Sequence, residues 1–202
     1  MAVRVKICGV TSAADAEAAI DAGAGMIGLN FHAPSPRYVD LVRARAVRDA
    51  IESRATVVGV FVNAARDFIE DRLRALRLDM LQFSGDENDN ALTGWLVPTI
   101  ATYRLKPGEI CSIADRVGDY ILFDSFSSKL YGGTGERFSL DQLRGIDLSR
   151  AIIAGGLTPE NVADAAALNP FAVDCASGVE SSPGVKDHAK LRSFVANAKR
   201  AR

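Results

Sequence analysis

Short apolar runs alternate with amphipathic stretches along almost the whole chain. The apolar runs are rich in β-branched residues and end at glycine, proline or polar residues, which is typical of buried strands in a parallel sheet. They predict strands at Val3–Ile7, Met26–Phe31, Thr56–Val62, Met80–Phe83, Pro98–Thr102, Tyr120–Phe123, Ala151–Ala154 and Ala172–Asp174.

The stretches between these runs have the spacing of amphipathic helices, and several begin with capping signals. Ser12 and Asp15 have capping-box spacing at the first helix, and Ser139 and Gln142 repeat it at the fourth. Thr158-Pro159 predicts a cap followed by proline at the first helical position. The helices are expected at about residues 12–22, 40–53, 65–77, 139–144, 159–168 and 187–199.

This alternation predicts an α/β protein with a parallel sheet and right-handed crossovers. Eight strand units are the number that closes a (β/α)8 barrel, the TIM-barrel fold, and 202 residues place it near the minimum size of that fold. An open doubly wound sheet would also alternate, but it gives no reason for eight units. We expect one domain over residues 1–202. The region 86–118 is rich in polar residues, glycine and proline, and predicts no firm helix.

Composition and charge exclude several classes of partner. Lys plus Arg number 24 against 25 Asp plus Glu, so the net charge of -1 leaves no electrostatic footprint for nucleic acid or a membrane surface. The basic end of the chain, residues 199–202, is expected to complement the dipole of the last helix. Three separated cysteines without a CxxC pair argue against disulfides and zinc and favour the cytoplasm. No signal peptide or membrane span is expected.

Glycines follow the last two predicted strands. Gly155 and Gly156 come directly after one of them, and Ser177 and Gly178 follow the other. Barrels commonly bind phosphate in the loops after these two strands, where glycine lets backbone N–H groups approach the anion. Tight turns without a ligand are the alternative. Because two consecutive loops share the feature, we predict a phosphate site.

A long segment, residues 125–138, follows the sixth predicted strand and contains Tyr131-Gly132-Gly133-Thr134-Gly135. Segments of this length inside a compact domain are usually functional or disordered. A lid or a further phosphate cradle is one interpretation, and a flexible surface loop is the other.

Two ionisable residues stand at the ends of predicted strands. Cys8 follows Val5-Lys6-Ile7, and Asp124 follows Ile121-Leu122-Phe123. The C-terminal ends of parallel strands meet at one rim, so a thiol and a carboxyl group could face each other across a pocket as base and acid. A lone cysteine on a strand is more often a small buried apolar residue, whereas an acid after such a run must be hydrogen-bonded or functional.

Arg37 lies in Pro34-Ser35-Pro36-Arg37-Tyr38 after the second predicted strand. The two prolines stiffen this loop and lower the entropy cost of presenting a guanidinium to a carboxylate. A solvated surface arginine is the alternative. Of the two histidines, His32 and His188, the first lies near the same rim and is interpreted as a loop residue.

Taken together, these stretches resemble the phosphoribosylanthranilate isomerases of tryptophan biosynthesis. The resemblance covers nearly the whole chain, with several motifs in the same order and at barrel spacing. The motifs are Val5-Lys6-Ile7-Cys8-Gly9, Ser35-Pro36-Arg37-Tyr38-Val39, Gly59-Val60-Phe61-Val62-Asn63, Leu81-Gln82 with Gly85, Asp124-Ser125, Tyr131-Gly132-Gly133-Thr134-Gly135, Ala154-Gly155-Gly156-Leu157-Thr158-Pro159-Glu160-Asn161 and Asp174 with Ser177-Gly178-Val179-Glu180.

The resemblance implies an Amadori rearrangement of N-(5'-phosphoribosyl)anthranilate. It implies that Asp124 is the general acid, Cys8 the general base and Arg37 the residue that holds the anthranilate carboxylate. It places Asp174 near the sugar. No metal or organic cofactor is implied, and a monomer is expected.

The resemblance also assigns the phosphate to the backbone around the two glycine loops, Gly155-Gly156 and Ser177-Gly178. One departure stands at Ser84, where the family usually has histidine. A phosphosugar-binding barrel that has lost turnover is therefore an alternative. Another phosphosugar barrel enzyme, such as a ribulose-phosphate epimerase, would need metal-binding histidines at the rim.

Overall fold

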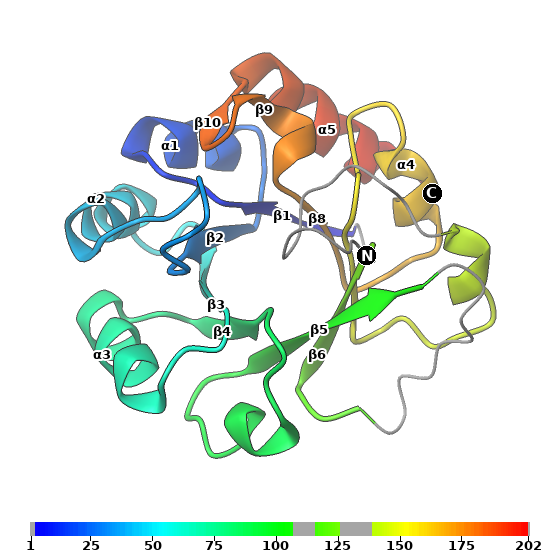
Figure 1. Cartoon of the computed structure of the whole chain (residues 1–202). Coiled ribbons are helices and arrows are strands. Elements are labelled where there is room, and N and C mark those ends of the chain that lie inside the picture. Colours follow the sequence, from blue (N-terminus) through cyan, green and yellow to red (C-terminus); the bar gives the residue numbers. More distant parts are fainter. Residues whose placement is uncertain (1–2, 107–115, 126–138, 202) are drawn as a thin grey trace.

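Eight parallel strands close into a barrel in sequence order, as Figure 1 shows along the barrel axis. This computed structural model describes residues 3–106, 116–125 and 139–201. The predicted TIM-barrel fold is confirmed, and the open-sheet alternative is wrong because β1 pairs with β8 as well as with β2. The strands are β1 (Arg4–Cys8), β2 (Met26–Asn30), β3 (Thr56–Phe61), β4 (Met80–Phe83), β5 (Thr99–Leu105), β6 (Tyr120–Ser125), β7 (Ala151–Ile153) and β8 (Ala172–Cys175).

Helices pack around the outside of this barrel (Figure 1). No helix in the described part of the chain is long and apolar enough to cross a membrane. The α-helices are α1 (Ala13–Asp21), α2 (Leu41–Ile51), α3 (Arg66–Leu76), α4 (Val162–Ala167) and α5 (His188–Arg200). Single 3-10 turns are η1 (Asp89–Leu92), η2 (Leu140–Leu143) and η3 (Ser177–Val179).

Two of the expected helices differ from the structure. The segment predicted at 139–144 forms only the 3-10 turn η2. Helix α4 begins at Val162, not at residue 159, and its N-cap is Asn161 instead of Thr158. The delay follows from the Asn161 side chain, which accepts a hydrogen bond from Thr158 N at 2.9 Å and donates one to Gly156 O at 3.1 Å. These bonds stabilise a turn before the helix.

The two expected capping boxes have different outcomes. Ser139 and Gln142 form the complete box at η2. At α1, the Ser12 side chain accepts from Asp15 N, but the Asp15 carboxylate turns away from the helix end. It accepts from Lys186 N at 3.3 Å and lies 2.9 Å from His188 Nε2. The start of α1 is therefore tied to the distant start of α5.

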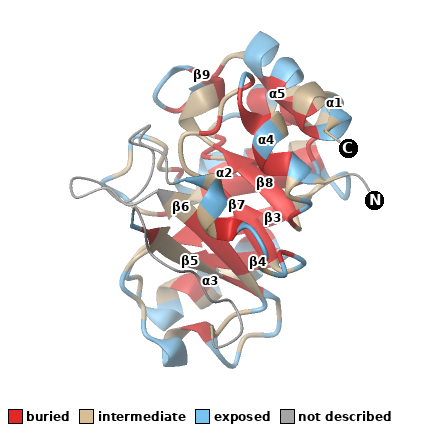
Figure 2. Ribbon diagram, turned by 90° about the vertical axis from the view of Figure 1, so that its right-hand side faces the viewer, coloured by how far each residue is buried: buried red, intermediate tan, exposed pale blue. Residues whose placement is uncertain are grey.

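The barrel separates two apolar cores, and the strands are buried on both faces (Figure 2). The larger core lies between the strands and the surrounding helices. The smaller one fills the interior with side chains from β2 to β8, which makes the barrel a packed core and not a pore. Its buried members are Met26, Val58, Met80, Ile100, Leu122, Ile152, Ala154 and Ala172.

A small antiparallel hairpin outside the barrel was not expected from the sequence. It consists of β9 (Glu180–Ser182) and β10 (Val185–Lys186) and lies between η3 and α5. Thr11 Oγ1 donates a hydrogen bond of 2.6 Å to Gly184 O and fixes the hairpin to the segment after β1. The hairpin therefore brings Glu180 and Lys186 to the C-terminal rim of the barrel.

Candidate active site

A pocket opens at the C-terminal ends of the strands, and most of the predicted site residues line it. The predicted residues around this pocket are Cys8, Arg37, Asp124, Gly155, Gly156, Asp174 and Ser177. Gly178 follows directly in the turn η3. The loop residue His32 also lies in the wall. The expected lid segment Tyr131–Gly135 and Cys111 lie outside the described residues.

Cys8 is the last residue of β1, and its side chain is partly exposed to the pocket. Burial raises the pKa of this thiol above its usual value, while the neighbouring ammonium of Lys6 acts to lower it. Asp124 lies in β6, three strands away from β1 round the closed barrel, and also lines the pocket. A proton donor and a proton acceptor can therefore reach one bound molecule from two sides.

Arg37 lines the pocket, but its guanidinium already holds a protein carboxylate. Its Nε and Nη2 donate to the two carboxylate oxygens of Glu180 at 2.9 and 2.8 Å, which is the bidentate fork of a strong charge-assisted pair. Although burial opposes it, this pairing keeps the pKa of Arg37 above its usual value. Glu180 thus orients the guanidinium at the rim.

Lys186 ties this pair to the ends of β1 and β8. Its fully buried ammonium donates to Glu180 Oε1 at 2.8 Å, to Cys8 O at 2.7 Å and to Ala176 O at 3.0 Å. Burial raises the pKa of Glu180, but the hydrogen bonds and charges of Arg37 and Lys186 outweigh it, so the pKa lies below its usual value. One lysine therefore connects the predicted base, the predicted carboxylate-binding residue and the loop after β8.

The two glycine loops meet closely. A Cβ at Gly178 would overlap the carbonyl oxygen of Leu157, so only glycine lets these loops approach. Cys175 Sγ donates to the same carbonyl at 3.1 Å. Gly155 and Gly156 both have positive φ angles, 84° and 65°. This packing concentrates backbone groups at one corner of the pocket, as phosphate binding requires.

The β4–β5 side of the pocket is polar. Ser84 Oγ lies 3.0 Å from Gln82 Nε2 and 2.9 Å from Thr102 Oγ1. Arg104 donates to the carbonyl of Ser84 and lines the same wall. The Ser84 hydroxyl therefore has hydrogen-bond partners on both β4 and β5.

Sequence reasoning missed Lys6, Glu180, Lys186, Arg104 and Thr102. Lys6 carried a usable signal, because a charged residue inside an apolar strand, two positions before Cys8, lies on the same face of that strand. Glu180 and Lys186 gave no such signal, since Arg37 and Cys8, the residues that they bind at the rim, are far away in the sequence. Among the described residues, no cluster of three His, Cys, Asp or Glu side chains could hold a metal ion.

The fold and the pocket define a class of protein, a barrel enzyme with ionisable side chains at the rim and glycine loops suited to a phosphate. The family model of N-(5'-phosphoribosyl)anthranilate (PRA) isomerase matches residues 5–197. The chain belongs to this family, as its resemblance predicted.

Relatives that carry the isomerase name match this chain over nearly their full length. The isomerase of Pseudomonas fluorescens (strain Pf0-1) is 46% identical over 96% of this chain and 97% of its own, and that of Myxococcus xanthus is 45% identical over 98% and 97%. The crystal structure of the Thermus thermophilus isomerase has a TM-score of 0.89 at 32% identity, covering 99% of this chain and 100% of its own. A structure of the isomerase in complex with reduced 1-(o-carboxyphenylamino)-1-deoxyribulose 5-phosphate has a TM-score of 0.75 at 30% identity, covering 98% of both chains.

Proposed function

We propose that this barrel isomerises N-(5'-phosphoribosyl)anthranilate to 1-(2-carboxyphenylamino)-1-deoxyribulose 5-phosphate, with Cys8 as general base and Asp124 as general acid. The family membership supports the reaction. The observation that carries the residue roles is that Cys8 and Asp124, from β1 and β6, line one pocket together with the glycine loops. A catalytically impaired barrel is not favoured, because relatives carrying the isomerase name match almost the whole chain.

The proposed reaction needs two proton transfers. Asp124 donates a proton to the ring oxygen of the ribose, the C1–O bond breaks, and the nitrogen lone pair forms a Schiff base with C1. The Cys8 thiolate then removes the proton from C2, the C–H electrons form a C1–C2 double bond, and the nitrogen regains its lone pair. The resulting enolamine tautomerises to the ketone. The substrate nitrogen stabilises each intermediate, so this chain supplies only positioning and proton transfer.

Three further groups fix the substrate in this proposal. Backbone N–H groups around Gly155, Gly156, Ser177 and Gly178 hold the phosphate. The guanidinium of Arg37, oriented by Glu180, attracts the anthranilate carboxylate. Asp174, which lines the pocket from β8, is proposed to lie near the sugar.

Steady-state kinetics of Cys8→Ala and Asp124→Asn test the roles of base and acid. We expect each to lower kcat by about 10²-fold or more, the usual contribution of a general acid or base. The reaction is followed by the decay of anthranilate-type fluorescence. Asp164→Asn, at an exposed carboxylate on α4, is the matched control and should keep its kcat.

Binding of the reduced product analogue separates chemistry from folding. Both variants should still bind it, because the phosphate loops are unchanged. Near-normal turnover in Cys8→Ala would remove Cys8 from the role of base. Analogue binding by the unmodified protein without any isomerisation would support the impaired-barrel alternative instead.

Assembly and location remain predictions. We propose a monomer in the cytoplasm, although the Thermotoga maritima isomerase is dimeric. Light scattering over a range of protein concentrations tests the monomer, and a mass of twice 21.5 kDa at all of them would contradict it.

A further inference from the structure

Lys6 is a charged residue in the barrel interior that the proposed reaction does not yet use. Its side chain is completely buried, and its neighbours in the pairing register are Met26 on β2 and Asp174 on β8. Other strands fill comparable interior positions with apolar side chains such as Val58 and Ile152. A buried ammonium is costly unless it is paired, so its presence on β1 requires a reason.

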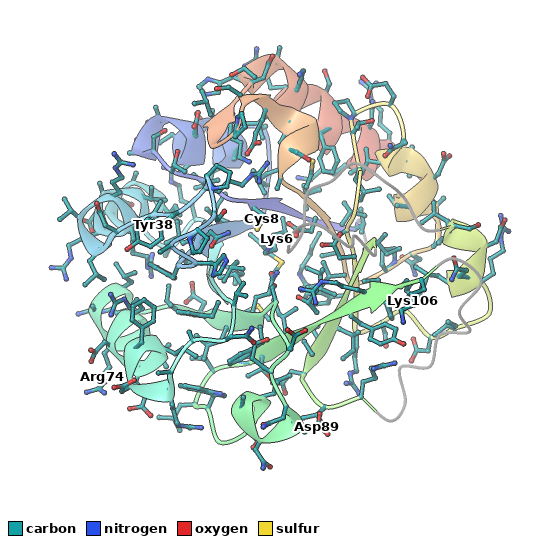
Figure 3. All side chains as sticks on the ribbon, viewed as in Figure 1. Lys6, Cys8, Tyr38, Arg74, Asp89 and Lys106 are labelled. Atoms are coloured by element: carbon teal, nitrogen blue, oxygen red, sulfur yellow. The ribbon has the colours of Figure 1, made fainter. Side chains whose placement is uncertain are left out.

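The ammonium of Lys6 lies between Asp174 and Cys8. Lys6 Nζ is 3.1 Å from Asp174 Oδ1. Gly28 on β2 leaves room for the approach to the thiol, because a Cβ at this glycine would lie 2.9 Å from Cys8 Sγ and 3.3 Å from Lys6 Nζ. Figure 3 shows Lys6 and Cys8 side by side near the centre of the barrel mouth.

Neither charged atom of the Lys6–Asp174 pair has a well-directed hydrogen bond among the described residues. The pair is therefore held by charge at short distance, and the ammonium keeps donor capacity. Although burial lowers the pKa of Lys6, the negative charges of Asp174 and Cys8 outweigh it and keep the pKa above its usual value. Lys6 therefore stays positively charged beside a thiol that can become an anion.

We infer that Lys6 is a positioning residue that supplies the counter-charge for the thiolate of Cys8, and that Asp174 holds Lys6 in place beneath it. This inference rests on the proposed role of Cys8 as the base. In the reaction, the C2–H bond breaks, the proton bonds to Cys8 Sγ, and the electron pair remains with the enolamine. Lys6 keeps its proton throughout. Before the transfer its positive charge stabilises the Cys8 thiolate, and after the transfer, when Cys8 is neutral, the charges of Lys6 and Asp174 balance each other.

Other charges around the thiol must be considered as well. Lys186 from β10 also favours the thiolate, whereas Asp174 disfavours it. Arg37, after β2, lies within electrostatic reach of Cys8 but is paired with Glu180. Asp124 and Arg104 line the pocket wall on β6 and β5. Lys6 differs from all of these groups because it is fully buried on the same strand face as the thiol.

The rate of Cys8 alkylation by iodoacetamide, measured against pH and assigned by peptide mass spectrometry, tests the inference without any turnover. The plateau of the rate at high pH reports how accessible Cys8 is to the reagent, and the midpoint of the curve reports the pKa of its thiol. We expect Lys6→Met to move the midpoint upward by about 1 to 3 pH units, the usual effect of one nearby opposite charge. Below the midpoint, this corresponds to at least a tenfold slower alkylation.

Two further variants test the direction in which each neighbouring charge shifts the midpoint. Lys6→Arg keeps the charge and should restore most of the rate. Asp174→Asn removes a negative charge near the thiol, so the midpoint should move downward and alkylation should be faster than in the unmodified protein. Gln82→Met, which removes a buried polar group on β4 without changing the charge, is the matched control and should leave the midpoint in place.

Loosening of the structure cannot imitate the result, because access of water to a buried thiol lowers its pKa, opposite to the change expected for Lys6→Met. A midpoint in Lys6→Met that is equal to or lower than normal overturns the inference. If Lys6→Met does not fold, Lys6→Gln, which keeps a polar side chain without the charge, decides, and an unchanged or lower midpoint overturns the inference. Failure of the proposed role of Cys8 as the base is recognised by a different result, normal turnover in Cys8→Ala.

Discussion

The two ends of the barrel interior are built from opposite kinds of side chain. Toward the N-terminal ends of the strands, residues such as Met26, Val58 and Ile152 form a closed apolar plug. Toward the C-terminal ends, Cys8, Asp124 and the glycine loops surround an open polar pocket. Side chains alternate between the inside and the outside of the barrel along each strand. Two successive inward-facing positions on one strand can therefore serve different purposes, the first in the apolar core and the second in the pocket.

Strand β1 departs from this division. Strand β1 contributes no apolar side chain to the inner core. It contributes the buried cation Lys6 instead, and Cys8 follows two positions further toward the rim. The polar end is also reinforced from outside the barrel by Lys186 and Glu180. The polar end thus depends on paired charges for its shape, whereas the apolar end depends on the packed volume of its side chains.

The largest effect is expected at Lys186. Lys186→Met removes three hydrogen bonds and leaves Glu180 buried with only Arg37 as its charge partner. Breaking a buried ion pair from one side usually costs about 3–5 kcal/mol. We expect the free energy of unfolding, measured in urea, to fall by about this amount.

The double variant Glu180→Gln/Lys186→Met should lose further stability, because the Arg37 guanidinium then loses its bidentate carboxylate partner as well. A loss below about 1 kcal/mol in Lys186→Met would show that the charge network contributes little to the polar end.

At the apolar end, Ile152→Ala should destabilise the protein by about 2–5 kcal/mol, since Ile152 is completely buried and a cavity would remain. Ile152 is not among the residues that line the pocket. Thus kcat at a temperature where the variant is folded should stay near normal, and a large drop in kcat would contradict the separation of the two ends. Ile152→Val, with a smaller cavity, is the graded control.

Gly178→Ala tests the corner between the glycine loops. A methyl group there would collide with the carbonyl of Leu157 and push the loops apart. Loss of one hydrogen bond to a charged group costs about 1.5–3 kcal/mol, so KM should rise roughly 10- to 100-fold with a smaller change in kcat. Competitive inhibition by inorganic phosphate should weaken in parallel. Unchanged phosphate inhibition would place the phosphate elsewhere.

The smallest effect concerns Cys175 at alkaline pH. Burial raises the pKa of this thiol from 9.0 to about 12. Between these values the unfolded chain loses the proton while the folded chain keeps it, so stability must fall as pH rises above 9. We expect a contribution of about 1 kcal/mol to the loss between pH 9 and 10.

Urea unfolding of the unmodified protein and of Cys175→Ala at pH 8 and pH 10 measures this contribution. Cys175→Ala should lose less stability over that interval. Equal losses in both proteins would show that this thiol does not titrate as its burial requires.

Most of the fold could be predicted from the sequence because strand burial in a barrel is a local pattern. All eight predicted strands are present, and only their ends differ by a few residues, as at β5, which continues to Leu105. The β9–β10 hairpin could not be predicted in this way. Its seven residues are mostly polar, and its position depends on contacts with Thr11 and Asp15.

The residues of the candidate site also fall into those that a local sequence pattern predicts and those that it does not. Cys8 and Asp124 were recognisable because they end apolar runs, and Gly155 and Gly178 because they follow them. The interaction of Glu180 with Arg37 joins residues 143 positions apart and has no local sequence signal. Position along a strand can thus predict which side chains reach the rim, while the charge pairs that orient them require the folded chain.

A crystal structure of this protein with reduced 1-(o-carboxyphenylamino)-1-deoxyribulose 5-phosphate would show whether Cys8 and Asp124 face each other across the sugar. Our account predicts the phosphate against the backbone of Gly155, Gly156 and Gly178, with Cys8 Sγ in contact with C2 and the Asp124 carboxyl on the other side of the sugar. A phosphate bound elsewhere, or Cys8 and Asp124 on the same side of the sugar chain, would contradict it.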